Sequence, residues 1–128
     1  MKVGSVYKWV TTKAKSHDER TKYHVFICEG DWQDGHTFLF ISSEDIDVGG
    51  DYQITKPPYD FLTKPISFIS CSSIVTYTEE ELATMGNAIG QLSVEHLTEL
   101  HQALANSDTM TAKHIKRCCN AIMDALKA

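Results

Sequence analysis

The chain has 128 residues, 42% of them hydrophobic, and a formal net charge of −5 at pH 7. This length and hydrophobic content predict a single domain, residues 1–128, with a core of its own. The acidic balance argues against a broad basic face for duplex nucleic acid, and the chain lacks the apolar run of about 18 residues that a membrane span needs.

The first predicted element is a strand over Val3–Thr11, which is rich in β-branched and aromatic residues. Because Met1–Thr12 lacks the basic, apolar and small-residue order of a secretion signal, we expect a cytoplasmic protein. The following segment, Thr12–Thr21, is polar and shows no periodicity. It predicts an exposed loop, and loops carried by a sheet often hold functional residues.

A β-hairpin is predicted next, from the runs Tyr23–Cys28 and Thr37–Ile41 and the Gly- and Asp-containing connection between them. Both runs are almost continuously apolar, which indicates that the hairpin is covered on both faces. Polar residues stand at its open end: Arg20, Lys22 and His24 beside the first run, and Ser42, Ser43 and Glu44 after the second. Since these ends are neighbours in an antiparallel pair, they form a rim where a site could lie.

Shorter strands are predicted over Tyr52–Ile54, Ile66–Ser70 and Ile74–Tyr77, with a kink at 71–73. Thr78 and Glu81 form a capping box for a helical turn that ends at Gly86. Residues 87–92 form a further candidate strand.

Two amphipathic helices are predicted after the strands. Ser93 is a candidate N-cap for the first, whose apolar stripe comprises Val94, Leu97, Leu100, His101 and Leu104. The second follows Thr111, with a stripe of Ile115, Cys118, Cys119, Ile122 and Leu126. The order of strands and helices predicts an α+β fold, with a small β-barrel over residues 3–92 and two C-terminal helices over 93–127.

The rim carries the residue types needed for metal-free RNA cleavage. That reaction requires a base for the ribose 2′-hydroxyl, an acid for the leaving oxygen and a cation for the phosphorane charge. His17 and His24 can exchange protons near neutrality, and Arg20 or Lys22 can hold a phosphate. The alternative is a solvated charged loop beside the barrel.

Several segments together resemble the MazF/PemK family of type II toxin–antitoxin toxins, over about residues 4–106. They are Gly4-Ser5-Val6-Tyr7, Tyr23–Cys28, Phe38–Ser43, Ile66–Ile74, and Ile89–Leu97 leading into a helix. The resemblance implies an SH3-like barrel, commonly a homodimer, that cleaves single-stranded RNA without metal and is neutralised by a cognate antitoxin protein. The chain departs from the family at Lys22-Tyr23, where Arg-Pro is usual, and at Ser70-Cys71-Ser72, where an Arg and an Asp often flank the Cys.

The leading hypothesis is therefore a toxin-like endoribonuclease that needs no metal or cofactor. Its predicted catalytic residues are Arg20, Lys22, His24 and His17, and its predicted substrate-binding residues are Ser42, Ser43, Lys15 and Ser72. The competing hypothesis is a catalytically inactive SH3-like barrel that binds a protein or peptide, with the C-terminal helices as its interface.

Overall fold

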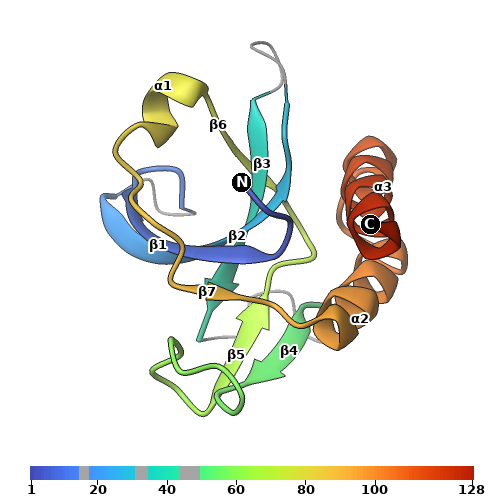
Figure 1. Ribbon diagram of the computed structural model, residues 1–128. Coiled ribbons are helices and arrows are strands. Elements are labelled where there is room, and N and C mark those ends of the chain that lie inside the picture. Colours follow the sequence, from blue (N-terminus) through green and yellow to red (C-terminus); the bar gives the residue numbers. More distant parts are fainter. Residues whose placement is uncertain (15–17, 31–34, 44–49) are drawn as a thin grey trace.

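The computed structural model describes residues 1–14, 18–30, 35–43 and 50–128, which form an antiparallel sheet with two helices packed beside it (Figure 1). Its elements are β1 (Ser5–Thr11), β2 (Arg20–Cys28), β3 (His36–Ser42), β4 (Tyr52–Thr55), β5 (Ile66–Ile69), β6 (Val75–Tyr77), α1 (Glu79–Leu82), β7 (Gly90–Gln91), α2 (Val94–Ala105) and α3 (Ala112–Lys127). The strand order is β4-β5-β3-β2-β1-β7, and β6 also pairs with β3. The sheet curls into a half-barrel, and the predicted α+β class is confirmed.

The hairpin of β2 and β3 lies in the middle of this sheet. Its register runs from Tyr23 opposite Ile41 to Phe26 opposite Phe38, with an irregularity between Phe26 and Cys28. Side chains alternate between the two faces of a strand. Val25 therefore enters one core, whereas Phe26 and Phe38 enter a second core on the other face. The prediction of a hairpin covered on both faces is confirmed.

Helices α2 and α3 cover the first core (Figure 1). Their buried residues are Leu97, Leu100, Leu104, Cys118 and Ile122. The predicted N-cap Ser93 is present, because its hydroxyl accepts a backbone N–H group of the first turn of α2, and Thr111 caps α3 in the same way. Arg117 ties α3 to the hairpin by donating from Nη2 to the carbonyl oxygen of Gly35 at 2.8 Å.

The second core is aromatic and is closed by β6 and α1. Its buried residues are Tyr7, Phe26, Phe38, Val75, Tyr77 and Met85. The predicted capping box begins α1: the Thr78 hydroxyl accepts from the Glu81 N–H, and the Glu81 carboxylate accepts from the Thr78 N–H at 2.9 Å. After α1 the chain turns at Gly86, whose φ is +84°.

Two local predictions need correction. Val94 was predicted in the buried stripe of the first helix, but its side chain is 70% exposed. It is the first residue of α2, and the buried face is set by the leucines of the later turns. Of the strand predicted over residues 87–92, only Gly90–Gln91 forms, opposite Val6 and Ser5 of β1.

All four cysteines, Cys28, Cys71, Cys118 and Cys119, are free thiols. Burial raises the pKa of the Cys118 thiol to about 12. None of the helices in the described ranges has the length and apolar character needed to cross a membrane.

Candidate functional site

One face of β2 changes from cationic to aromatic along its length. The side chains of Arg20, Lys22, His24 and Phe26 lie on the same face of β2. The first three of these residues pair with Thr11, Trp9 and Tyr7 of β1, respectively. Arg20 is exposed, Lys22 is partly buried, and His24 and Phe26 are buried. The beginning of β2 therefore presents its cations where the aromatic core opens to solvent.

A pocket of about 370 Å³ lies at this opening, and we call it the rim pocket. Its cations are Lys13, Arg20 and Lys22, and its hydroxyl groups are those of Ser42, Ser70, Ser72 and Ser73. Asp51 contributes a carboxylate, and Phe40, Phe68 and Ile74 contribute apolar surface. The Lys13 ammonium is paired with Glu81, so Arg20 and Lys22 against the one carboxylate make this a locally positive site on an acidic chain. Clustered cations and hydroxyls of this kind suit a phosphate ligand.

Local contacts hold several of these groups in place. The Lys22 ammonium lies 5.6 Å from the centroid of the Phe40 ring. Asp51 accepts the backbone N–H of Cys71 through Oδ1 at 3.0 Å, which joins the start of β4 to the end of β5. The hydroxyls of Ser70 and Ser72 lie 3.2 Å apart. The kink predicted at residues 71–73 thus forms one wall of the rim pocket.

His24 lies beneath this surface, and its expected place on the rim needs correction. Its side chain is 0% exposed, among the rings of Trp9, Phe38, Phe40 and Tyr77. The strand begins at Arg20, three residues earlier than the apolar run suggested, so His24 falls inside the sheet. Burial lowers its pKa from 6.5 to about 4, and the ring is neutral at pH 7.

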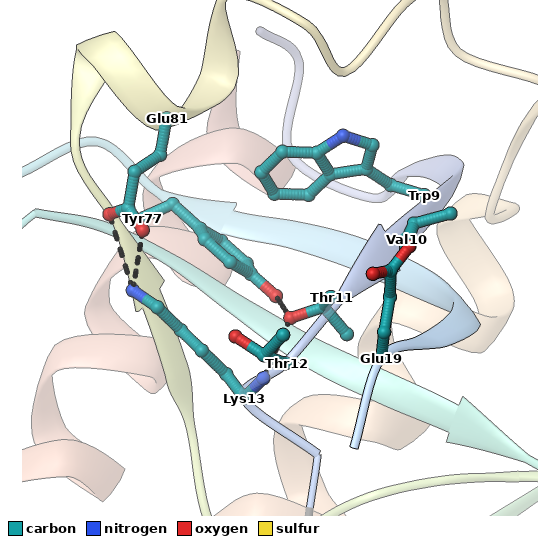
Figure 2. Close-up of a pocket in the computed structure, with 8 residues that line it drawn as sticks. All are labelled: Trp9, Val10, Thr11, Thr12, Lys13, Glu19, Tyr77 and Glu81. Atoms are coloured by element: carbon teal, nitrogen blue, oxygen red, sulfur yellow. Dashed lines mark hydrogen bonds and ion pairs between the residues drawn. The ribbon is translucent and has the colours of Figure 1, made fainter. Parts of the chain in front are cut away.

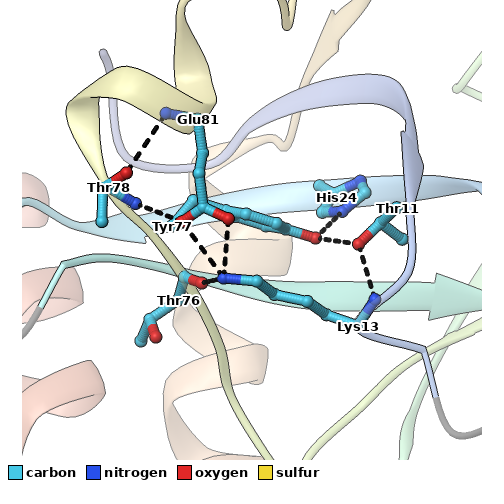
Figure 3. A network of polar contacts seen from close by, with 7 residues as sticks. All are labelled: Thr11, Lys13, His24, Thr76, Tyr77, Thr78 and Glu81. Carbon is cyan, nitrogen blue, oxygen red and sulfur yellow. Dashed lines mark hydrogen bonds and ion pairs between the residues drawn. The ribbon is translucent and has the colours of Figure 1, made fainter. Parts of the chain in front are cut away.

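Two hydrogen bonds of His24 define its tautomer, and Figure 3 shows the one to Tyr77. Nδ1 lies 2.9 Å from the carbonyl oxygen of Lys22, which can only accept, so Nδ1 carries the proton. Nε2 therefore accepts from the Tyr77 hydroxyl at 2.9 Å. The Tyr77 oxygen in turn accepts from the Thr11 hydroxyl at 2.7 Å, and that oxygen accepts the backbone N–H of Lys13 at 3.0 Å. His24 is held as a neutral, fully bonded side chain.

Other predicted site residues lie beside the rim pocket or outside the described residues. Ser43 lines a neighbouring pocket of about 200 Å³ together with Lys64, and this pocket shares Lys22 and Ser42 with the rim pocket. Lys15 and His17 lie outside the described residues. The structure thus brings together Arg20, Lys22, Ser42 and Ser72, and it separates His24 from them.

Sequence reasoning missed Lys13, Asp51 and Ser70 as lining residues. Lys13 belonged to a loop without periodicity, and Asp51 followed an acidic turn that offered no motif. One signal could have pointed to Asp51, because it stands immediately before the strand that pairs with Ile66–Ile69, and the serines follow that segment.

No group of three or more His, Cys, Asp or Glu side chains within the described ranges is arranged to hold a metal ion. The sequence matches no family model, and a search of curated proteins finds no significantly similar one. The chemistry of the rim pocket therefore has to be judged from its own residues.

Proposed function

We propose that this chain is a toxin-like endoribonuclease that binds single-stranded RNA in the rim pocket and cleaves it without a metal ion. One observation carries the proposal: cations and hydroxyl groups from separate segments of the chain converge on one pocket. Lys13 follows β1, Arg20 and Lys22 open β2, Ser42 ends β3, and the other serines follow β5. The curled sheet is also compatible with the SH3-like barrel that the MazF/PemK resemblance implies.

The neighbouring pockets favour an extended anion over a compact one. Lys22 and Ser42 line both the rim pocket and the pocket of Ser43 and Lys64. Cations are thereby spread from Lys13 to Lys64 along adjoining hollows. A single-stranded RNA backbone presents phosphates at intervals and can follow such a surface without a duplex-sized basic face.

The groups that line the rim pocket suggest how the reaction proceeds. The Asp51 carboxylate takes the proton of a ribose 2′-hydroxyl, and the resulting oxygen attacks the adjacent phosphorus. Arg20 and Lys22 balance the charge on the phosphorane, and a lysine ammonium or water gives a proton to the leaving 5′-oxygen. The products are a 2′,3′-cyclic phosphate and a 5′-hydroxyl. His24 then acts as a positioning residue, because its Nδ1–H holds the backbone of Lys22.

The test is cleavage of a long, unstructured RNA in the presence of EDTA. Wild type should give discrete fragments ending in cyclic phosphate, and Arg20→Gln, Lys22→Ala and Asp51→Asn should each reduce the rate at least about tenfold. Asn keeps the oxygen that accepts the Cys71 N–H, so Asp51→Asn tests the charge with little effect on folding. Lys116→Ala is the matched control, because Lys116 is an exposed lysine on α3.

A chain that neither binds nor cleaves RNA would contradict the proposal and favour the protein-binding alternative. No comparable observation among the described residues supports that alternative. The apolar stripes of α2 and α3 are buried in the chain's own first core, and Val94 and Met123 are the large apolar side chains that these helices expose. Toxicity on expression, relieved by Asp51→Asn, would place the chain in a toxin–antitoxin system.

A further inference from the structure

A second pocket, of about 290 Å³, adjoins the rim pocket and is built from aromatic groups (Figure 2). We call it the aromatic pocket. Trp9 and Tyr77 line it with ring centroids 4.7 Å apart and planes inclined at 68°. Val10, which is 44% exposed, adds apolar surface. This volume is just below the range of about 300–1,000 Å³ that is usual for small-molecule sites.

The charges of the aromatic pocket are unsuited to a phosphate. Two carboxylates, Glu19 and Glu81, line it, and in Figure 2 they lie on opposite sides of the rings. Glu81 is engaged by Lys13, whose Nζ lies 3.1 Å from Oε2, and by the capping box of α1. The Glu19 side chain forms no ion pair with another residue in the described ranges. The ligand that fits is flat, uncharged and able to donate hydrogen bonds.

Lys13 joins the two pockets, since it lines both. Its ammonium donates to the carbonyl oxygen of Thr76 at 2.7 Å and lies 4.6 Å from the centroid of the Tyr77 ring. β1 and β2 meet here, with Thr11 opposite Arg20. A phosphate held by Arg20 would therefore place the base of the adjoining nucleotide beside Trp9.

We propose that the aromatic pocket is a nucleobase subsite that prefers guanine. This inference rests on the proposed function, because it places one base of the same RNA. The base packs against the partly exposed Trp9 ring, as unstacked bases commonly do on aromatic side chains, and the buried Tyr77 ring forms the floor of the pocket. Guanine presents two adjacent donors, N1–H and the 2-amino group, to the Glu19 carboxylate. Uracil presents one donor between two carbonyl oxygens, which the carboxylate repels.

The test compares two uncleavable 2′-O-methyl pentanucleotides, UUGUU and UUUUU, by fluorescence anisotropy. Wild type should bind the guanine-containing strand at least about tenfold more tightly, as expected when hydrogen bonds are made to a charged group. Glu19→Gln should bring the ratio of the two affinities close to one. Glu80→Gln should retain the ratio, since Glu80 is an exposed glutamate of α1 that does not line the pocket.

Tryptophan fluorescence gives a second, independent readout. The chain has two tryptophans, so the variant Trp32→Phe leaves Trp9 as the sole reporter. UUGUU should quench its emission more strongly than UUUUU at equal occupancy. Equal affinities for the two strands, with unchanged Trp9 emission, would overturn the guanine subsite. If Lys22→Ala then still weakens both strands, the proposed function stands. Failure of wild type to bind either strand would overturn both proposals.

Discussion

The Tyr77 hydroxyl lies 2.9 Å from Nε2 of His24 and joins the last strand of the aromatic core to the central hairpin (Figure 3). It also accepts a hydrogen bond from the Thr11 hydroxyl, so the hydrogen bonds of this one oxygen link β6 to β2 and to β1. Burial raises the Tyr77 pKa to about 12, and the hydroxyl keeps its proton at all physiological pH values.

Removal of this hydroxyl should destabilise the fold. In Tyr77→Phe the Nε2 atom of His24 and the hydroxyl of Thr11 both lose a buried partner, which should lower the free energy of unfolding by about 2 kcal/mol. Urea denaturation at pH 7 measures the change. Tyr7→Phe is the control, because Tyr7 lies in the same core and its hydroxyl has no hydrogen bond to another described residue. Equal stability of the two variants would contradict the network.

The burial of neutral His24 should make stability depend on pH. Its pKa is about 4 in the folded chain and about 6.5 when unfolded, so between these values the unfolded state binds more protons. The free energy of unfolding should therefore be highest above pH 6.5 and should fall by about 3 kcal/mol as the pH drops to 4.

The variant His24→Gln isolates this effect from the other titrating groups. It should be less stable than wild type at pH 7, and the gap should narrow steadily between pH 6.5 and 4. Urea midpoints at half-unit pH intervals provide the comparison. A gap that stays constant with pH would show that His24 is not the titrating group.

Two glycines with positive φ offer a matched test of backbone strain and close packing. Gly86 has φ +84° and open space around an added Cβ, so Gly86→Ala should cost about 1 kcal/mol from the left-handed conformation alone. Gly4 has φ +88°, and an added Cβ would lie 2.7 Å from Nε2 of Gln91.

Gln91 cannot move away freely, because its amide donates to the carbonyl oxygen of Val3 at 2.9 Å and accepts from the Ser5 hydroxyl at 3.0 Å. Gly4→Ala should therefore lower the free energy of unfolding by clearly more than Gly86→Ala. Thermal denaturation of the two variants beside wild type decides the order. The reverse order would indicate that β7 tolerates displacement from β1.

The elements that could be predicted are those with local signals. The caps at Thr78 and Ser93 depend on residues at most three positions away, and the apolar runs of the hairpin indicate their own burial. His24 was predicted at the rim because the apolar run begins only at Tyr23, whereas β2 begins at the polar residue Arg20.

The rim pocket could be predicted only in part. Arg20, Lys22 and Ser42 are neighbours by hairpin pairing, which a sequence can reveal. Lys13 and Asp51 reach the pocket through the curl of the sheet. That curl depends on packing between distant segments and leaves no periodic signal in the chain.

Salt dependence offers a quantitative test of how many phosphates the rim pocket contacts. For a single strand, the logarithm of the binding constant falls with the logarithm of salt concentration with a slope of about −0.7 per neutralised phosphate. Lys13 is paired with Glu81, so if Arg20 and Lys22 each contact one phosphate, the slope for UUUUU should be about −1.4. Lys22→Ala should reduce it to about −0.7. Lys116→Ala on α3 should leave the slope unchanged. A slope near zero in wild type would mean that the cations of the rim pocket do not engage the RNA backbone.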